Sequence, residues 1–592
     1  MAEAVEAPSK DTAALDHEAI KKTGRGFLVI TAAKVWFLVT SAVIQLGLPI
    51  IFGSAEQFGV FKIVTETIGL INMVMIIGSL QAVSKLVSEQ PERASQVVRL
   101  AVRLQLMLGV PVALLYALGS PYIAASFNDP SLTGLFRLSS LIILFYAFYA
   151  IFVGYLNGLK EFVKQASLDM TFATMKMVGI LGLVLLGFGV IGAVAGFVIA
   201  AGLICVISGA WTLRLMRRRA AIAAEASGPP DAQTRAEASA SLKRLLSYLV
   251  LVMLYTFALN GIMRSDLFIL KAVAADMPAQ FAGMENIFAL ISNKFAGFYG
   301  AVLNIARIPY QGVIAVTFVI FPLISQSTFS DDTEKTRGYV RETFRYCLLL
   351  IGGVAMLLAF NSDSIIAALY SADYGRAAVA LSILSVSIIF FALFYVATTM
   401  IIGSGHPLAA VVIMGASMVV SAVLNYVFIS RVHQSTMEML ATHHSAPGEL
   451  ALADSPMAAV HQAIELASNR ADFAAPYLLE GTLYMQQAAI ATTIAMVFGF
   501  VVSLCWLYYK FRAVLPVATI ARLLLAAVAL FGIDQLWPMD PALVAIQGKM
   551  FYLLMIVAKM AVMGIAMLGV LAVAREFTAK DFNRFKAVIG RS

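Results

Sequence analysis

The chain has 592 residues, of which 60% are hydrophobic and 13% are charged. Soluble domains contain about 25% charged residues, so this composition excludes an ordinary soluble protein. Apolar runs of about 20 residues recur along the chain, and each is long enough to cross a hydrocarbon core about 30 Å thick. Because these runs lack the alternation of barrel strands, we expect an all-α polytopic membrane protein.

The net charge of +8 raises the question of a nucleic-acid partner, but its distribution argues against one. With a cytoplasmic N-terminus, most Lys and Arg residues fall in segments on the cytoplasmic side, as the positive-inside rule requires. An even number of spans then places both termini in the cytoplasm. The three cysteines, Cys205, Cys347 and Cys505, all lie in predicted spans, so no disulfide framework is indicated.

The first half of the chain begins with a polar tail, residues 1–25, in which no cleavable signal peptide is visible. Residues 26–213 are predicted to form a first lobe of six spans. These lie at about 26–52, 59–87, 97–125, 135–158, 167–189 and 191–213. Residues 214–244 form a basic cytoplasmic linker with the triplet Arg217-Arg218-Arg219, which is typical of an orientation signal or an anionic-lipid contact.

The second half, residues 245–509, is predicted to form a second lobe of six spans. These lie near 245–272, 298–325, 340–361, 377–403, 408–430 and 484–509. Residues 510–574 add two further spans, at about 515–537 and 550–574, and a basic cytoplasmic tail follows at 575–592. The prediction is therefore about 14 transmembrane helices.

A weak internal repeat relates the two lobes. Gly59 and Gly297 stand 238 residues apart, and two pairs of arginines follow at an offset of 242: Arg99 with Arg341, and Arg103 with Arg345. A slowly drifting offset is typical of an old duplication, although similarity between apolar runs also arises by chance. The repeat predicts two pseudo-symmetric six-helix lobes with a shared site at their interface.

A polar segment, residues 431–483, interrupts the spans on the predicted outer side. It is acidic on balance, contains a helical stretch at 458–469, and includes four of the six histidines: His433, His443, His444 and His461. A metal site needs a defined fold and ligand spacing, which the sequence does not reveal here. A solvated outer insert is the simpler interpretation.

Basic residues inside the spans are the candidate substrate contacts. An ionisable residue within a span costs roughly 2.5–3.5 kcal/mol on insertion scales, so it usually faces a cavity or a partner. The candidates are Lys34, Lys62, Lys176, Arg264 and Arg307. An inward-facing basic set suits an anionic substrate, and arginines favour phosphate or carboxylate. The alternative is that several of them reach an interface or form structural pairs.

Other polar residues in the spans have two interpretations each. Asp266 and Glu66 are either ion-pair partners of these cations or titrating coupling sites, and Glu66 is spaced to pair with Lys62 at i,i+4. Lys559, in the last span, either lines a groove for a lipid tail or reaches the interface. Four amides could contact sugar or form the commoner interhelical hydrogen bonds: Gln45, Asn72, Asn260 and Asn304.

The sequence contains no catalytic motif of the common types. A Walker loop, a His/Cys metal cluster on a span and a nucleophile elbow are all absent from it, so we expect neither an enzyme nor a cofactor. Proline interrupts several spans, at Pro49, Pro111, Pro309 and Pro322. Such breaks allow helices to bend, and we interpret them as hinge candidates for alternating access.

Three motifs resemble the oligosaccharide flippase family. They are Ala55-Glu-Gln-Phe-Gly-Val-Phe61, then Arg264-Ser-Asp266-Leu-Phe-Ile-Leu, and Gly297-Phe-Tyr-Gly-Ala-Val-Leu-Asn-Ile-Ala-Arg307-Ile-Pro309, which runs on to Phe321-Pro322-Leu-Ile-Ser325. The resemblance is to the polysaccharide-biosynthesis branch of the superfamily that also holds lipid II flippases and multidrug extruders. It covers residues 24–430 well and residues 484–574 loosely.

The resemblance implies two six-helix lobes around a central, often cationic cavity. It also implies that a polyprenyl-diphosphate-linked oligosaccharide moves from the inner to the outer leaflet of the bacterial inner membrane. Lys34, Arg264 and Arg307 lie in spans that line the cavity in such proteins. Membrane lipids and polysaccharide-assembly proteins would be the partners. A proton or sodium gradient, or the membrane potential, would supply the energy.

Several alternatives stay open at this point. The first span has Lys34 and Gln45 but lacks the paired arginines of lipid II flippases. This departure argues against lipid II as the substrate without excluding it. A cation-coupled exporter of drugs or metabolites would depend on a carboxylate such as Asp266 or Glu66. A saccharide polymerase or ligase would use residues 431–483 as its catalytic loop, and a non-transporting scaffold is a further alternative.

Overall fold

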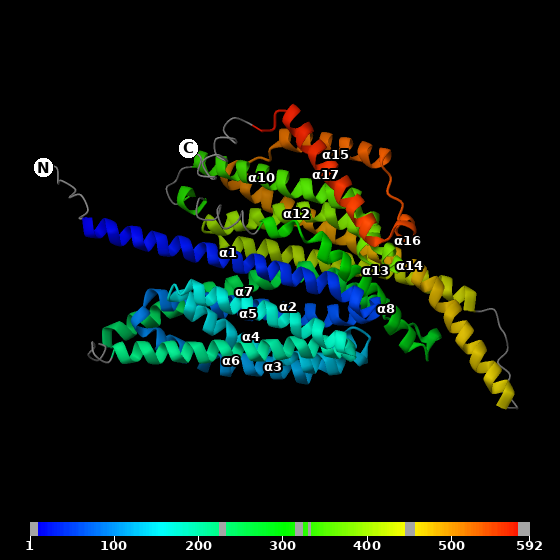
Figure 1. Cartoon of the computed structure of the whole chain (residues 1–592), viewed down its shortest axis with the longest axis horizontal. Coiled ribbons are helices and arrows are strands. Elements are labelled where there is room, and N and C mark those ends of the chain that lie inside the picture. The colour runs from blue at the N-terminus through cyan, green and yellow to red at the C-terminus, as the bar shows by residue number, and fades with distance from the viewer. Residues whose placement is uncertain (1–9, 224–231, 314–323, 329–332, 445–455, 578–592) are drawn as a thin grey trace. The chain divides into compact units, whose positions relative to one another are not determined.

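The computed structural model describes residues 10–223, 232–313, 324–328, 333–444 and 456–577 (Figure 1). Every regular element in these ranges is helical. This confirms the predicted all-α class. The apolar composition accounts for it, because a helix satisfies its own backbone hydrogen bonds inside a hydrocarbon layer.

The chain divides into two compact units. The first comprises residues 1–51, 64–123 and 131–253. Its helices are α1 (Lys10–Phe52), α2 (Ala55–Glu89), α3 (Ala94–Ser126), α4 (Thr133–Gly158), α5 (Phe162–Leu183) and α6 (Gly189–Ala223). Helices α4, α5 and α6 pack against one another. At their contact the Tyr146 ring lies between two phenylalanines, with its centroid 5.2 Å from that of Phe172 and 6.0 Å from that of Phe197.

Helices α5 and α6 form a tight hairpin. The chain reverses at Gly187 and Gly189, which have φ values of +90° and +55°, a region that glycine enters without steric cost. Away from the turn the two backbones still lie close together: a Cβ added at Gly179 would lie only 2.7 Å from the carbonyl oxygen of Gly196. The small residues permit this contact, and the reversal agrees with the predicted spans 167–189 and 191–213.

The second unit comprises residues 52–63, 124–130 and 254–592, and therefore includes two short segments from the first half of the chain. Its helices are α7 (Ala232–Ala274), which begins in the first unit, α8 (Glu285–Ala306), α10 (Thr333–Phe360), α11 (Ser362–Leu369), α12 (Ala378–Gly403), α13 (Pro407–His444), α14 (Pro456–Phe511), α15 (Val517–Leu536), α16 (Leu543–Gln547) and α17 (Lys549–Val573). Helix α12 packs against α8, α10, α13 and α14, with Phe391 and Phe394 fully buried.

Twelve helical segments in the described ranges are long and apolar enough to cross a membrane. One of them, Phe162–Arg219, contains α5 and most of α6. The predicted span 298–325 falls partly outside the described residues. The predicted total of about 14 is compatible with this arrangement.

Helices α15 and α17 dock onto the rest of the second unit through a buried carboxylate. The Glu576 side chain is fully buried, and its oxygens accept hydrogen bonds from Arg345 Nε at 2.6 Å, Arg522 Nη1 at 2.5 Å and Thr519 Oγ1 at 2.9 Å. These partners lie on α10 and α15. The two predicted appended spans are therefore tied to an arginine of the internal repeat.

Two boundaries differ from the predictions. Residues 431–444 and 456–483 of the predicted outer insert continue α13 and α14 as helix, so the described part of the insert extends two spans. The sequence predicts a surface helix from Met284 in the outer connection 273–296 and a separate span from 298, but the structure has one continuous helix, α8, that begins at Glu285. Apolar content located the spans, but good helix formers continue a helix beyond the apolar region.

Candidate functional site

The predicted cavity cations Lys34 and Lys176 lie in the first unit. Lys34 is exposed on α1. Lys176 on α5 is half-buried, and its Nζ lies 5.3 Å from the centroid of the Phe37 ring and 5.1 Å from that of Phe197. Two aromatic faces at this distance attract an ammonium group, so α1, α5 and α6 together hold this cation.

A carboxylate that was not predicted as a site residue lies on the same helix as Lys176 and interacts with Lys34. Asp169 on α5 accepts a hydrogen bond of 2.7 Å from the Tyr149 hydroxyl on α4 and interacts electrostatically with Lys34. Trp36 on α1 donates to the Thr174 hydroxyl on α5 at 2.9 Å. The signal was present, because Asp169 is an acidic residue within the predicted span 167–189. The first unit therefore has a mixed polar set rather than a purely basic one.

In the second unit, Asp266 and Arg307 share an internal cavity. Asp266 on α7 is 1% exposed and accepts a hydrogen bond of 2.9 Å from the Tyr299 hydroxyl on α8. Arg307, at the end of α8, donates to the carbonyl oxygen of Met263. The cavity has a volume of about 20 Å³ and is also lined by α12 and α14. That volume suits about one water molecule, so this cavity is too small for a saccharide.

Arg264 lies on α7, two residues before Asp266. Its Nη1 donates to the side-chain oxygen of Asn260 at 2.6 Å and to the backbone oxygen of the same residue at 3.2 Å. The predicted sugar-contact candidate Asn260 therefore orients an arginine within its own helix. A guanidinium matches the oxygens of phosphate and carboxylate in charge and geometry, which keeps Arg264 among the candidate anion contacts.

Lys62, at the start of α2, is buried in the second unit. Its Nζ donates to the side-chain oxygen of Asn304 on α8 at 2.7 Å, and a Cβ at Gly300 would lie 2.7 Å from Lys62 Cγ. Lys62 is thus packed against α8 together with a second predicted sugar-contact candidate. Glu66 is half-buried on the part of α2 that belongs to the first unit. Its predicted role in coupling or pairing stays a prediction.

A deeply buried ion pair between α7 and the turn after α3 was not predicted from the sequence. Lys271 on α7 and Asp129, in the turn after α3, are 0% and 1% exposed and lie 2.9 Å apart. Lys271 also donates to Ser292 Oγ at 2.8 Å, and Asn293 Nδ2 donates to Asp129 at 3.0 Å. We call these four residues the Lys271 cluster. Hydrogen bonds from α8 to both charges reduce the cost of burying the pair.

The α2 and α8 helices cross beside this cluster, at Gly59 and Gly297. A Cβ at Gly59 would overlap the carbonyl oxygen of Asn293, and a Cβ at Gly297 would overlap that of Ala55. Ala55 and Asn293 are separated by 238 residues, as are the two glycines. The contact is therefore symmetric with respect to the internal repeat, and each glycine faces the residue four positions before its counterpart.

The predicted hinge prolines lie in three different settings. Pro49 lies inside α1 and Pro111 inside α3, which also contains Pro121. Pro309 is buried in the turn after α8, which ends at Ala306. Pro322 lies outside the described residues. Pro309 therefore ends a helix, because its ring cannot continue the hydrogen-bond ladder.

Two further expectations concern Lys559 and the histidines. Lys559 on α17 is buried and donates to Asp534 on α15 at 2.7 Å, so it forms a structural pair and neither reaches the interface nor lines a groove. His433 on α13 forms a hydrogen bond of 2.9 Å with the Tyr484 hydroxyl. Within the described ranges, no group of three His, Cys, Asp or Glu residues is arranged to hold a metal ion.

Comparison with known protein families shows which family the chain belongs to. The sequence matches the family described as "Polysaccharide biosynthesis protein" over residues 25–328, just over half of the chain. In the comparison with curated protein sequences, none matches the chain.

Solved structures of low sequence identity share the fold. One is the lipid II flippase MurJ in an inward closed conformation, with a TM-score of 0.59 and 12% identity over 93% of this chain and 98% of that one. Another is an inward-facing multidrug resistance transporter of the MATE family of the MOP superfamily, with a TM-score of 0.53 and 13% identity over 79% of this chain and 98% of that one. The chain belongs to the polysaccharide biosynthesis protein family and has the fold of the MOP superfamily.

Proposed function

We propose that the protein is a flippase that moves a lipid-linked, anionic saccharide from the inner to the outer leaflet of a bacterial inner membrane. The observation that carries this proposal is the family match, because polysaccharide biosynthesis needs saccharides on the far side of a membrane. The fold shared with a lipid II flippase supports it. The lipid carrier would be a polyprenyl diphosphate, whose prenyl chain stays in the bilayer while the polar head crosses.

Cationic side chains within the spans would lower the cost of moving the diphosphate. The charge must pass through hydrocarbon, where an uncompensated ion is strongly disfavoured. Arg264, which is held by Asn260, and Lys34, which is exposed on α1, would each bring a positive charge to the diphosphate. Lys176 would add positive charge in the first unit and Arg307 in the second, whereas Lys62 is committed to its contact with α8.

Asp266 is the candidate for energy coupling. It is buried, it accepts a hydrogen bond from Tyr299, and it lines a cavity with room for about one water molecule. A proton or a sodium ion arriving at this carboxylate would change the charge beside Arg307. A change in that charge would favour a different packing of α7 against α8, which is how an ion gradient could drive the cycle.

Alternating access would require the contacts around the Lys271 cluster to break. By the predicted topology they lie on the outer side, and they tie residues 52–63 and 124–130 to α7 and α8. Release of the saccharide would need these segments to leave α8, and the satisfied ion pair would reform on closure.

Translocation in proteoliposomes tests this function. A polyprenyl-diphosphate oligosaccharide is incorporated, and a leaflet-selective enzyme measures the fraction that becomes accessible. We expect wild-type protein to move the lipid and both Arg264→Ala and Lys34→Ala to slow it by about tenfold, the effect of one charge-assisted contact. Lipid II is the comparison substrate. No movement of any such lipid by folded protein would overturn the proposal.

A second candidate function is cation-coupled export of a small drug or metabolite. The observation that favours it is the buried carboxylate Asp266 in a fold shared with a multidrug transporter. The two functions differ in what they move, so uptake of a fluorescent cationic dye into the same proteoliposomes separates them. Dye movement that Asp266→Asn abolishes, without lipid movement, would favour the exporter.

A further inference from the structure

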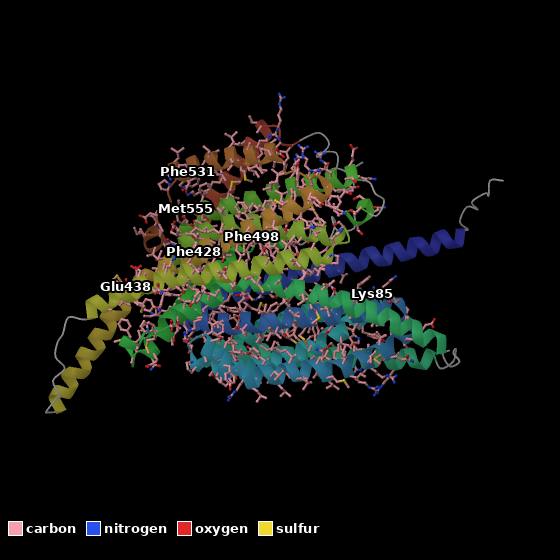
Figure 2. The ribbon with its side chains drawn as sticks, turned by 180° about the vertical axis from the view of Figure 1, so that it is seen from behind. Lys85, Phe428, Glu438, Phe498, Phe531 and Met555 are labelled. Carbon is pink, nitrogen blue, oxygen red and sulfur yellow. The ribbon has the colours of Figure 1, made fainter. Side chains whose placement is uncertain are left out.

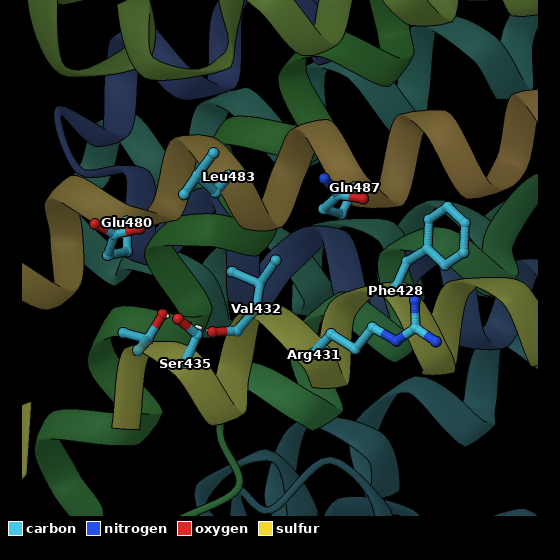
Figure 3. A pocket seen from close by; sticks show the side chains of 8 residues that line it. Phe428, Arg431, Val432, Ser435, Glu480, Leu483 and Gln487 are labelled. Atoms are coloured by element: carbon cyan, nitrogen blue, oxygen red, sulfur yellow. Dashed lines mark hydrogen bonds between the residues drawn. The ribbon is translucent and has the colours of Figure 1, made fainter. Parts of the chain in front are cut away.

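A pocket lies between α13 and α14, where both helices enter the predicted outer insert. It has a volume of about 360 Å³ and is lined by eight residues from these two helices. They are Phe428, Arg431, Val432, Ser435, Thr436, Glu480, Leu483 and Gln487. Figure 3 shows Phe428 and Arg431 at one end of the pocket and Ser435 and Glu480 at the other. The pocket therefore has a cationic end and an anionic end.

The cationic end is the one nearer the predicted span. Residues 408–430 are the apolar part of α13, and Phe428 lies at its edge, just before Arg431. From residue 428 to residue 436 the helix advances about 12 Å. Neither Arg431 nor Glu480 forms an ion pair with another residue in the described part of the chain. Both charges are therefore available to a ligand.

An apolar stripe leads away from the pocket along α14. The face that carries Leu483 and Gln487 continues with Ile494, Phe498 and Val501, at seven, eleven and fourteen residues after Gln487. These spacings place the side chains on one side of the helix, and all three are exposed. Phe498 and Phe428 are marked on the back of the molecule in Figure 2. The stripe suits a hydrocarbon chain.

We propose that this pocket binds the phosphate-linked head group of a membrane lipid on the outer leaflet. Arg431 holds the phosphate, since a guanidinium matches phosphate oxygens in charge and geometry. Ser435, Glu480 and Gln487 accept or donate hydrogen bonds to the amine or hydroxyl groups beyond it. The lipid chain lies along Ile494, Phe498 and Val501. The order of apolar, cationic and anionic side chains repeats the order of chain, phosphate and polar head in such a lipid.

Two kinds of lipid have this chemistry. One is a glycerophospholipid such as phosphatidylethanolamine, and the other is a polyprenyl-diphosphate saccharide. In the second case the pocket would receive the product of the proposed translocation, so that identification rests on the proposed function. The existence of the lipid site does not rest on the proposed function, because the site is inferred from the pocket and the apolar stripe alone.

Native mass spectrometry of the full-length protein in detergent tests the site without any transport. The probes are phosphatidylethanolamine, phosphatidylglycerol and undecaprenyl diphosphate, each titrated separately. We expect Arg431→Gln to weaken retention of all three by about tenfold, because each loses a charge-assisted contact. We expect Glu480→Gln to weaken phosphatidylethanolamine most, because that probe alone carries an amine.

Matched controls separate a site from general surface charge. Arg512→Gln removes an exposed arginine just beyond the opposite end of α14, and Glu438→Gln removes an exposed carboxylate further along α13 (Figure 2). The proposal would be overturned if the control variants lost as much lipid retention as Arg431→Gln, or if Arg431→Gln lost none. Tighter binding of undecaprenyl diphosphate than of the two phospholipids would identify a product site. The reverse order would identify a resident phospholipid. Neither order depends on whether the protein translocates lipid.

Discussion

At the scale of single residues, the pairing of Lys271 with Asp129 is the feature with the largest expected energetic consequence. Both charges are buried, and α8 supplies a hydrogen bond to each. Removing one partner leaves the other buried and uncompensated, which costs about 3–5 kcal/mol. We therefore expect Lys271→Ala to lower stability by about that amount, measured by thermal unfolding in detergent.

A surface pair provides the control for this prediction. Lys85 and Glu89 on α2 lie 3.8 Å apart with side chains 57% and 47% exposed. Exposed pairs contribute about 0–1 kcal/mol, so Lys85→Ala should change stability little. The double variant Lys271→Met with Asp129→Leu should recover much of the loss, because no charge is then buried alone. Similar effects for Lys271→Ala and Lys85→Ala would contradict the burial argument.

Asp266 is predicted to titrate during the transport cycle. Asp266→Asn keeps the size of the side chain and its contact with Tyr299 but cannot gain or lose a charge. We expect wild-type translocation in proteoliposomes to accelerate when a proton or sodium gradient is imposed. The variant should retain only the rate measured without a gradient. A variant that still responds to both gradients would remove Asp266 from the coupling mechanism.

The residue scale also shows where prediction from sequence stopped. Lys62 and Lys559 are unusual because they are cations within apolar runs. Their partners, Asn304 and Asp534, lie 242 and 25 residues away in the sequence. Asp129 carries no such signal, since an aspartate before a proline in a loop is ordinary. A buried charge can be recognised from its position in an apolar run, whereas its partner is set by how helices pack.

At the scale of elements, the crossing of α2 and α8 depends on Gly59 and Gly297. A methyl group at either position overlaps a backbone carbonyl oxygen of the other helix, so Gly297→Ala must push the helices apart. We expect a loss of about 2 kcal/mol in stability from the strain of overpacking, measured by thermal unfolding. Solvent access to a cysteine introduced at Ala55 should rise.

A second glycine tests whether the effect belongs to the crossing. Gly415 lies inside α13, and a Cβ there would have no neighbour within 4 Å. Alanine is the better helix former, so Gly415→Ala should leave stability unchanged or raise it slightly. If both variants lost stability equally, the close approach of α2 and α8 would not be the cause.

The docking of α15 and α17 should depend on pH through Glu576. Burial alone would raise the pKa of this carboxyl, but hydrogen bonds from Arg345, Arg522 and Thr519 outweigh it and place the pKa below its usual value. The ion contacts therefore stabilise the fold above the unfolded pKa of about 4.5 and are lost as the pH falls through the folded pKa.

The measurement is the thermal midpoint at pH 7 and at pH 4. We expect Glu576→Gln to lower stability by about 2 kcal/mol at pH 7, because two partly exposed arginines lose their charged partner. The difference in thermal midpoint between the variant and the wild type should become smaller at pH 4 and below. A gap that widens on acidification would contradict the assignment.

At the scale of the whole molecule, the contacts around Asn128 and Ala272 are predicted to open during transport. The Asn128 side chain donates to the Ala272 carbonyl oxygen at 3.2 Å, so cysteines at these two positions are within reach of a short thiol cross-linker. In a background with Cys205, Cys347 and Cys505 replaced, we expect cross-linking to stop lipid translocation in proteoliposomes. A reducible linker should allow full recovery.

Each single-cysteine variant treated with the same reagent is the control. Both should transport normally, because a modification on one side of the contact does not join the two segments. Continued translocation by fully cross-linked protein would show that these segments stay together throughout the cycle, and alternating access by separation at this point would be wrong.

The sequence by itself determined the all-helical class, the approximate number and order of the spans, and the internal repeat. These follow from local properties, because the length and apolar content of a run decide whether it crosses a membrane. The repeat also identified Gly59 and Gly297 as equivalent positions. It did not indicate that the two glycines touch.

Only the tertiary structure decided which polar residues meet. It grouped Asp266 with Tyr299 and Arg307, and it buried Lys271 against Asp129. It also made the described part of the predicted outer insert into extensions of α13 and α14, with a pocket between them. The physical reason is that an apolar run specifies a helix but hardly specifies its rotation or its neighbour. These are set by close packing and by the need to satisfy every buried charge.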